Sequence, residues 1–313
     1  MDHKDNHIDR REFLKKSGTI TAAAAVGALL LRKPKPLFAQ EGGTRDPDLV
    51  AVRNGSPEAM FDRGIAALGG MERFVRRGNT VVVKPNMAWN REPEEAANTN
   101  PRLVRRIVEH CYNAGAKRVY VFDHPVSYWK STYSTSGIER AAKEAGAQVV
   151  PANSHRDYEK VRIPGGNVLK EAEVHELILE SDVFINVPIL KHHSSTQLTM
   201  AMKNLMGVVW DRSYYHRNGL HQCIADFGLF RKPDLNVLDA YRIMLRRGPG
   251  YAGPDDIQLR KNLLLSRDIV AIDTAGAKIH GTDPQNVHYI RYAENNNLGT
   301  SDLDRLSIEK IVL

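Results

Sequence analysis

Lysine and histidine side chains cluster in one stretch of the sequence, INVPILKHHSSTQLTMAMKNLMGVV (residues 185–209). An apolar segment runs into Lys191, His192 and His193, and Lys203 follows within a methionine-rich segment. Lysines bind carboxylates and phosphates, and a histidine at a strand end serves as a general acid or base, a metal ligand or a solvated group. The stretch therefore indicates a polar site for a small anionic ligand.

The two adjacent histidines should differ in role. Neighbouring side chains on an extended chain point to opposite sides, so we expect one imidazole to face the ligand and the other to be solvated. No Asp or Glu stands at a metal-motif spacing such as HExxH, but a metal ion bound by His193 stays open. The charge of Lys191 would lower the pKa of the neighbouring imidazole and keep it neutral near pH 7.

Polar residues also follow three other apolar runs that are typical of buried strands. These polar ends are Lys84-Pro85-Asn86 after 80–83, Asp123-His124-Pro125 after 119–122, and Ser266-Arg267-Asp268 after 263–265. Ligands bind at the carboxyl ends of parallel strands, so we expect all three ends to converge with Lys191 along one edge. Lys84 is either a solvated strand end or a cation for the ligand, with the Asn86 amide beside it.

Lys203 and Asp273 lie in two expected helices, 198–209 and 268–280. Lys203 either packs its stem along the edge of the core, with its ammonium in water, or points into the same cleft as Lys191. Asp273 lies among small apolar residues, and a buried carboxylate there needs a partner. A structural hydrogen bond to a neighbouring helix terminus and a catalytic role are both open for Asp273.

Apolar runs alternate with segments of helical periodicity, which is typical of an α/β fold with a mostly parallel sheet and helices on both faces. The expected strands cover 80–83, 118–122, 148–150, 182–187 and 262–265, and the expected helices 100–114, 137–145, 198–209 and 268–280. The periodicity weakens over 153–173 and 211–254, which indicates a small irregular subdomain or a lid.

The N-terminal stretch DRREFLKKSGTITAAAAVGALLLRKPKPLFA (residues 9–39) resembles a twin-arginine (Tat) export signal. Its weakly apolar run, 18–31, is shorter than the ~20 residues of a membrane span. We therefore expect a signal segment over 1–39, transient contact with the Tat translocase, and a location in the periplasm or at the outer face of the cytoplasmic membrane. A linker over 40–48 and one α/β domain over 49–313 follow. Cleavage after Ala39 and retention of the signal as an anchor both stay open.

The formal net charge of +7 belongs largely to the signal. Residues 1–39 hold 8 of the 44 basic and 4 of the 37 acidic residues, which leaves 36 against 33. No basic run with interleaved aromatic residues remains, so nucleic acid is excluded as the main partner. The chain has two cysteines, Cys111 and Cys223, and cannot by itself hold an iron–sulfur cluster through four cysteines.

Five motifs together resemble the uncharacterised family DUF362. They are KPN at 84–86, the turn at 99–101, NVPILKHH at 186–193, MKNLMG at 202–207 and LLLSRDIVAIDTAGAKIHG at 263–281. The resemblance covers nearly the whole chain after residue 39 and implies an α/β domain without an assigned activity. Many relatives carry ferredoxin-type cysteine clusters, which this chain lacks.

The resemblance also implies which residues form the site. Lys191 and His193 match a K-x-H element, which favours His193 over His192 as the cleft-facing histidine, and Asp273 matches an acidic position in the late helix. Lys203 and Asn204 match a K-N element.

We expect an enzyme or a ligand-binding protein that acts on a small anionic substrate, with a metal ion as an open alternative. The residues expected to take part in catalysis are His193, as acid or base, Lys191, Lys203 and Asp273. The residues expected to bind the ligand are Lys84, Asn86, Asn204 and Asp123. Two other classes stay open. One is a non-catalytic redox-accessory or binding protein that works with an iron–sulfur partner, and the other is a structural scaffold.

Overall fold

The structure, a computed structural model, describes residues 46–313. The predicted export signal and most of the predicted linker lie outside the described residues. Asp48 leads directly into the first strand. None of the described helices is both long enough and apolar enough to cross a membrane.

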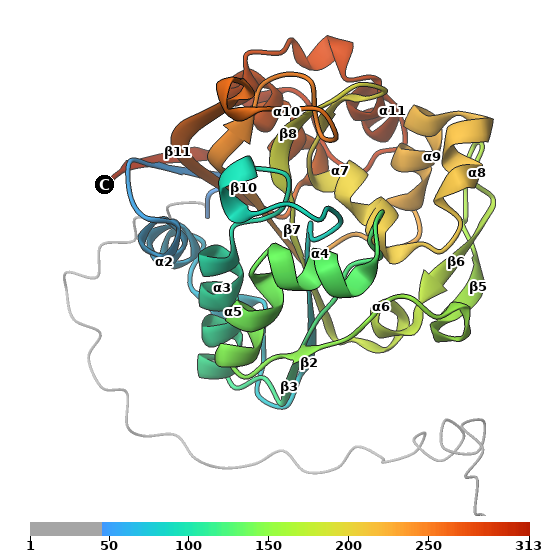
Figure 1. The fold of residues 1–313 in the computed structure, drawn as a ribbon. Coiled ribbons are helices and arrows are strands. Elements are labelled where there is room, and N and C mark those ends of the chain that lie inside the picture. Colours follow the sequence, from blue (N-terminus) through green and yellow to red (C-terminus); the bar gives the residue numbers. More distant parts are fainter. Residues whose placement is uncertain (1–45) are drawn as a thin grey trace, which may run out of the picture. The chain divides into compact units, whose positions relative to one another are not determined.

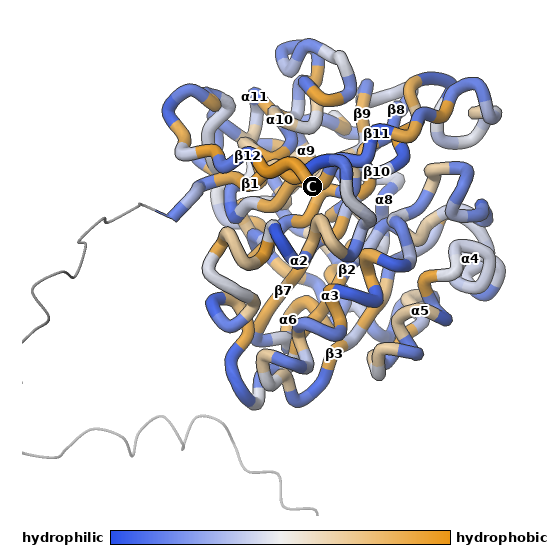
Figure 2. Tube along the Cα trace, turned by 90° about the vertical axis from the view of Figure 1, so that its left-hand side faces the viewer, coloured by the Kyte–Doolittle hydropathy of each residue, from blue (hydrophilic) through white to orange (hydrophobic). Residues whose placement is uncertain are grey.

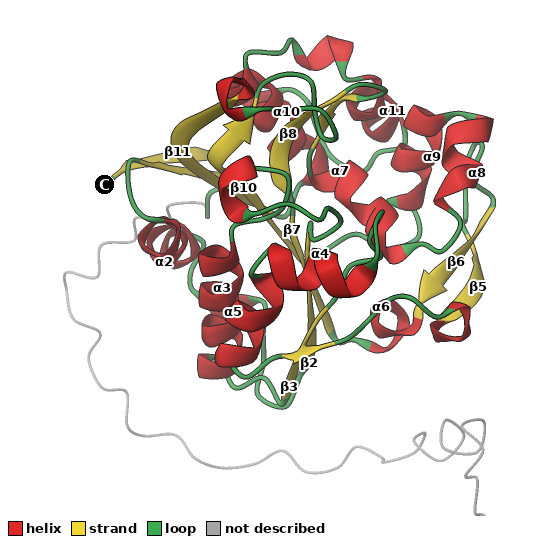
Figure 3. Cartoon of the chain, viewed as in Figure 1, coloured by secondary structure: helices red, strands yellow, loops and turns green. Residues whose placement is uncertain are grey.

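A ten-stranded sheet forms the centre of the described chain (Figures 1 and 3). Its strands are β1 (Leu49–Arg53), β2 (Thr80–Pro85), β3 (Arg118–Val121), β4 (Gln148–Val149), β7 (Val183–Val187), β8 (Ile189–His193), β9 (Gln197–Thr199), β10 (Leu235–Met244), β11 (Ile257–Ser266) and β12 (Ile308–Val312). The order is β12-β1-β11-β10-β7-β2-β3-β4, and β8 pairs with β10 and β9. A separate antiparallel pair consists of β5 (Tyr158–Arg162) and β6 (Glu171–His175).

Most neighbours in the sheet are parallel, as the sequence predicts. The series β10-β7-β2-β3-β4 is parallel throughout. In contrast, β11 runs antiparallel to both β1 and β10. The carboxyl end of β11 therefore points to the opposite edge, and the expectation that Ser266-Arg267-Asp268 joins the other polar ends is wrong. Asp268 instead accepts hydrogen bonds from Val270 and Ala271 as the N-cap of the following helix.

Helices cover both faces of the sheet. They are α2 (Pro57–Ala67), α3 (Pro101–Asn113), α4 (Trp129–Thr135), α5 (Ile138–Glu144), α6 (Glu176–Glu180), α7 (Ala201–Asn204), α8 (Arg212–Asn218), α9 (Leu220–Phe227), α10 (Ile269–His280) and α11 (His288–Asn295). Asn100 caps α3 and Pro101 stands at its first position. Asn is a preferred N-cap residue, and Pro is preferred at the first position of a helix. Hydrophobic residues concentrate along the strands, with hydrophilic ones at the periphery (Figure 2).

Two apolar clusters correspond to the two faces. In β2, Val81 and Val83 pack with α2, α3 and α5, whereas Val82 packs on the other face with α9, α10 and α11. This alternation follows from the two-residue period of a strand, and it explains why β2 is apolar without interruption. Cys111 and Cys223 are buried in different clusters and are both free thiols.

Two expected segments differ from the structure. The helix predicted over 198–209 is a strand, β9, followed by α7 and a short 3-10 helix (Leu205–Val208). The region 211–254 is not irregular, because it contains α8, α9 and the long strand β10. Polar residues at 236, 239 and 242 interrupt the apolar sequence of β10, so this strand does not appear as an apolar run.

Candidate functional site

A cavity of about 360 Å³ opens beside the carboxyl ends of β2 and β3. Strand β8, α7 and α8 complete its wall. The charged and titratable side chains that line it are Lys84, Asp123, His124, Lys191, His193, Lys203, Arg212 and His216. Two of the predicted strand ends therefore meet β8, as expected for the carboxyl edge of an open α/β sheet.

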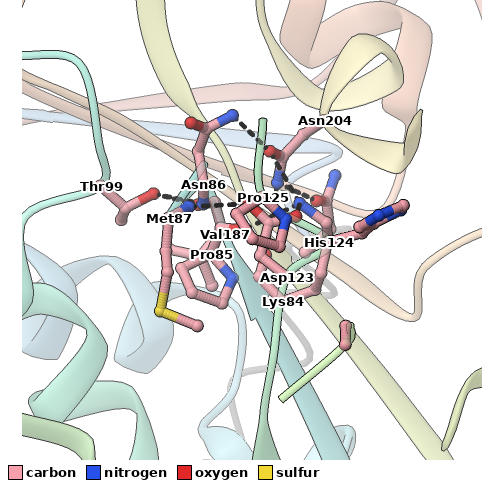
Figure 4. Close-up of polar contacts among 12 residues, drawn as sticks. Lys84, Pro85, Asn86, Met87, Thr99, Asp123, His124, Pro125, Val187 and Asn204 are labelled. Atoms are coloured by element: carbon pink, nitrogen blue, oxygen red, sulfur yellow. Dashed lines mark hydrogen bonds and ion pairs between the residues drawn. The ribbon is translucent and has the colours of Figure 1, made fainter. Parts of the chain in front are cut away.

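Lys84 and Asp123 form a buried ion pair at the base of this cavity (Figure 4). Their Nζ and Oδ1 atoms are 2.8 Å apart, and each side chain is only 1% exposed. The Lys84 ammonium also donates to the Pro85 carbonyl at 2.8 Å and to Asn204 Oδ1 at 3.0 Å. The ammonium is thus surrounded by one carboxylate and two uncharged acceptors. Asp123 Oδ2 in turn accepts from the Met87 amide at 2.8 Å.

The surroundings of Lys84 bear on both interpretations of it. Lys84 is not a solvated strand end, because its side chain is buried; burial lowers its pKa, and the Asp123 carboxylate opposes that change. Its charge is paired with Asp123 and two of its N–H groups donate within the protein, so contact with a ligand stays a prediction. We conclude that Lys84 and Asp123 hold the ends of β2 and β3 together under the cavity.

A chain of asparagine amides runs from the cavity into the sheet. Asn204 Oδ1 accepts from Asn86 Nδ2 at 2.9 Å, and Asn204 Nδ2 donates to Asn186 Oδ1 at 2.9 Å. Asn186 Nδ2 then donates to Asn236 Oδ1 at 2.9 Å. Lys84, Asn186 and Asn236 are register partners in neighbouring strands, so the sheet itself aligns these groups. The amide of Asn204 is fully used and positions its neighbours.

Asn86 is held from three sides. Its backbone N–H donates to Thr99 Oγ1 at 2.8 Å, and the Thr99 hydroxyl donates to the Val187 carbonyl at 2.7 Å (Figure 4). Its side-chain carbonyl accepts from Lys191 at 3.0 Å. One N–H of the Asn86 amide stays available to a ligand. Thr99 thus does more than precede a helix cap, because it fixes the KPN segment to the end of β7.

Lys191 has a different environment from Lys84. Its Nζ donates to Asn86 Oδ1 at 3.0 Å and to the Ala97 carbonyl, and the side chain is buried. Burial lowers the pKa of Lys191 to about 7. The charge of Asp123 opposes this shift, and the charges of Lys203 and Lys84 add to it.

Lys203 and Arg212 supply the remaining positive charge. Lys203 contacts Met206 Sδ at 3.5 Å, and burial followed by the charge of Arg212 lowers its pKa to about 8. Arg212 donates to the carbonyls of His124 and Pro125 at 2.9 and 2.7 Å. Among the ion pairs of the described residues, none includes Lys191, Lys203 or Arg212. The cavity therefore carries cations without a matching carboxylate.

His193 lines the cavity, whereas His192 lies outside it and accepts from the Gly248 amide at 3.1 Å. Burial, followed by the charges of Lys203 and Lys191, lowers the pKa of His193 to about 2. The imidazole is neutral, and its Nδ1 accepts from the Ser195 amide at 3.1 Å. The proton therefore resides on Nε2, which makes His193 a hydrogen-bond donor to the cavity rather than a base.

His124 also lines the cavity, and the sequence analysis did not select it as a site residue. Its Nδ1 lies 2.9 Å from the Val209 carbonyl and must donate to it, so Nε2 keeps its lone pair. Burial and then the charge of Arg212 lower the pKa of His124. Its ring stacks on Trp210 at 5.0 Å between centroids. The sequence pattern could have identified His124, because it directly follows Asp123 at a predicted strand end.

Asp273 does not line the cavity, and its carboxyl makes the structural hydrogen bond to a helix terminus that the sequence analysis left open beside a catalytic role. Its Oδ1 and Oδ2 accept from the Ala201 and Met202 amides at 2.6 and 3.0 Å. These are the first N–H groups of α7, so the carboxyl caps the helix that carries Lys203. Burial raises the pKa of Asp273 to about 7.

The described part of the chain contains no group of three or more His, Cys, Asp and Glu side chains that could hold a metal ion. The nearest charged neighbours of His193 are Lys203 and Lys191, which repel a cation. A metal ion at His193 therefore stays a prediction, and the described residues offer His193 no group of further metal ligands.

The fold and the cavity define an α/β protein with a cation-lined cavity at the carboxyl edge of its sheet. Residues 81–278 match the model of the domain of unknown function DUF362. This span is more than half of the chain, so the protein belongs to that family, and the resemblance seen in the motifs is confirmed.

Known proteins that are similar to this chain include a cyanobacterial protein and a bacterial enzyme of solved structure. The "Thylakoid-associated protein sll1697" of Synechocystis sp. is 26% identical over 234 residues, which cover 70% of this chain and 68% of that protein. The lactate racemase apoprotein from Thermoanaerobacterium thermosaccharolyticum matches 73% of this chain at 12% identity with a TM-score of 0.49. The chain spans 56% of the length of that structure.

Proposed function

We propose that this protein binds a small anionic molecule, of the carboxylate or phosphate class, in the cavity between β2, β8, α7 and α8. The observation that carries the proposal is the charge of the cavity wall. Lys203 and Arg212 line it without a carboxylate partner among the described residues, whereas Lys84 is neutralised by Asp123. A partly buried cation without a partner is costly, and an anionic ligand would remove that cost.

The amides and histidines would orient such a ligand. Asn86 and His193 each present an N–H group, and Lys203 and Arg212 supply charge. Charge-assisted hydrogen bonds of this kind are roughly twice as strong as neutral ones. His124 adds a neutral acceptor for a proton. The set contains a charge clamp, hydrogen-bond donors and a base, and together they fit an enzyme that acts on a small anion.

Calorimetric titration with oxalate and with phosphate tests the proposal. We expect binding of at least one of the two anions, and a loss of affinity on the order of tenfold or more in Lys203→Gln, since a hydrogen bond to a charged group contributes about 1.5–3 kcal/mol. Lys278→Gln is the matched control, because Lys278 is exposed on α10 and lies outside the cavity. Equal affinity in both variants, or no binding of any anion, would refute the proposal.

We also propose export through the twin-arginine pathway, on the strength of the sequence of residues 9–39 alone. The ligand would then be met outside the cytoplasm.

A further inference from the structure

The number of acceptors around each lysine nitrogen separates Lys84 from Lys191. A lysine ammonium has three N–H donors and a neutral amine has two. Lys84 Nζ has two hydrogen-bond acceptors and, 2.8 Å away, the Asp123 carboxylate as an ion-pair partner. Lys191 Nζ has two acceptors, Asn86 Oδ1 and the Ala97 carbonyl, and both are uncharged. The first environment fits a cation, and the second fits a neutral amine.

We propose that Lys191 is a nucleophile that forms an imine with the carbonyl carbon of a small anionic substrate, of the 2-oxo carboxylate class. This inference rests on the proposed function, because the anionic group of the substrate would occupy the cation site. The neutral amine of Lys191 donates both of its N–H groups, one to Asn86 and one to the Ala97 carbonyl. Its lone pair therefore has no protein partner. Because Lys191 lines the cavity, this lone pair is available to a bound substrate.

The protein holds the acceptors of Lys191 in place. Asn86 is tied to Thr99 through its backbone and to Asn204 through its side chain. Lys191 itself belongs to β8, where it pairs with Thr199 of β9 and with Met244 of β10. An amine fixed on a strand and oriented by fixed acceptors is preorganised for attack on a bound carbonyl.

Electrostatics favours the same state. The Lys191 nitrogen is buried, and the nearby charges of Lys203 and Lys84 disfavour a further cation. The resulting pKa of about 7 leaves a large share of the amine neutral at physiological pH. Burial next to another cation is a general way of activating a lysine toward carbonyl compounds.

The proposed reaction is a condensation without change of oxidation state. The Lys191 nitrogen forms a bond to the carbonyl carbon while the C=O π electrons move to oxygen, which His193 Nε2–H stabilises by a hydrogen bond. His124 Nε2 carries two protons in turn from nitrogen to this oxygen. The first transfer gives the carbinolamine, and the second lets the oxygen leave as water as the C=N bond forms. Amine plus carbonyl therefore give imine plus water. Lys203 and Arg212 hold the carboxylate.

Reductive trapping tests the inference. The full chain is incubated with pyruvate and sodium borohydride, whose hydride converts the imine into a stable secondary amine, and the modified lysine is located by peptide mass spectrometry. We expect modification of Lys191 at least tenfold faster than of the exposed Lys278. Lys84 should stay unmodified. Excess oxalate, which has no ketone, should slow the reaction by occupying the same cavity.

The controls separate this inference from the proposed function. Lys191→Met should lose the modification and keep measurable oxalate binding, which also shows that the variant is folded. If oxalate binds but Lys191 is modified no faster than Lys278, or if Lys203 is modified instead, the imine proposal is wrong and the anion site stands. If neither oxalate nor phosphate binds and oxalate does not slow trapping, the proposed function itself fails.

Discussion

At the scale of single residues, the lysines of the site differ in what surrounds them. Lys84 is matched by a carboxylate and two further acceptors, Lys191 by two neutral acceptors, and Lys203 by a sulfur atom. The sequence presents them as three equivalent cations at a strand end or in a helix. The side-chain partners of Lys84 and Lys191 come from residues more than thirty positions away, which no local pattern indicates.

The buried pair should be costly to break. Asp123→Ala leaves the Lys84 ammonium buried without its carboxylate, and we expect a loss of about 3–5 kcal/mol in the free energy of unfolding. Denaturant unfolding measures it. Glu139→Ala, which removes the partner of the exposed Lys143, should cost about 0–1 kcal/mol. Equal losses in the two variants would show that the pair around Lys84 is not buried as described.

Gly207 should tolerate no side chain. A Cβ at this position would lie 1.9 Å from Asp123 Oδ1 and 2.7 Å from Lys84 Nζ, so Gly207→Ala must push the ion pair apart. We expect destabilisation of about 1–3 kcal/mol. Gly250→Ala is the control, because the nearest atom to its Cβ is 4.0 Å away in Trp89. A Gly207→Ala protein as stable as the wild type would contradict this packing.

At the scale of elements, α7 is the piece that links the core to the site. It has only four residues, and an isolated helix of that length would not form in water. Asp273 of α10 binds its first two N–H groups, and Asn204 at its other end binds Lys84. The late acidic residue therefore acts on the site through the helix that carries Lys203.

The Asp273 cap should give the protein a measurable pH dependence. Its pKa is about 7 in the folded protein against an ordinary value of 3.8, so the folded state binds the proton more tightly. The stabilising contribution is complete below pH 4 and is lost as the pH rises through about 7, a change on the order of 4 kcal/mol. Subtracting the stability curve of Asp273→Asn from that of the wild type isolates it. A difference curve that is flat, or that rises with pH, would contradict the assignment.

Strand ends were predictable and strand directions were not. The apolar runs before Lys84 and Asp123 located two carboxyl ends correctly, because buried parallel strands are apolar on both faces. The run before Lys191 ends at Val187, and Lys191 lies inside the next strand, β8. The run before Ser266 looks the same, yet β11 is antiparallel. An apolar run carries no mark of its direction, which depends on the partner strands on either side.

At the scale of the whole molecule, the cation site is assembled from distant parts of the chain. Arg212 comes from α8, a region without a clear apolar period, and it reaches the carbonyls of His124 and Pro125. Sequence analysis therefore missed Arg212 and found the lysines. The fold class followed from alternating strands and helices, whereas the residues that complete the cavity became visible only once β3 and α8 were placed together.

Export is a property of the whole chain and can be tested separately. Replacing both Arg10 and Arg11 by Lys should retain the protein in the cytoplasm, because the paired arginine is the feature that the Tat pathway recognises. Cell fractionation and immunoblotting measure the distribution. Lys33→Arg is the charge-matched control and should be exported normally. Unchanged export of the Arg10 and Arg11 double variant would exclude this route.

The most direct measurement of the central claim is the affinity for oxalate between pH 6 and pH 9, since oxalate keeps its charge over this range. The pKa of Lys203 is about 8 in the free protein, so we expect the affinity to fall as the pH rises through 8 and the ammonium is lost. Lys203→Gln should bind weakly, with a smaller pH dependence. Oxalate binding that is equally strong at pH 6 and pH 9, or that strengthens with pH, would contradict a site built on buried cations.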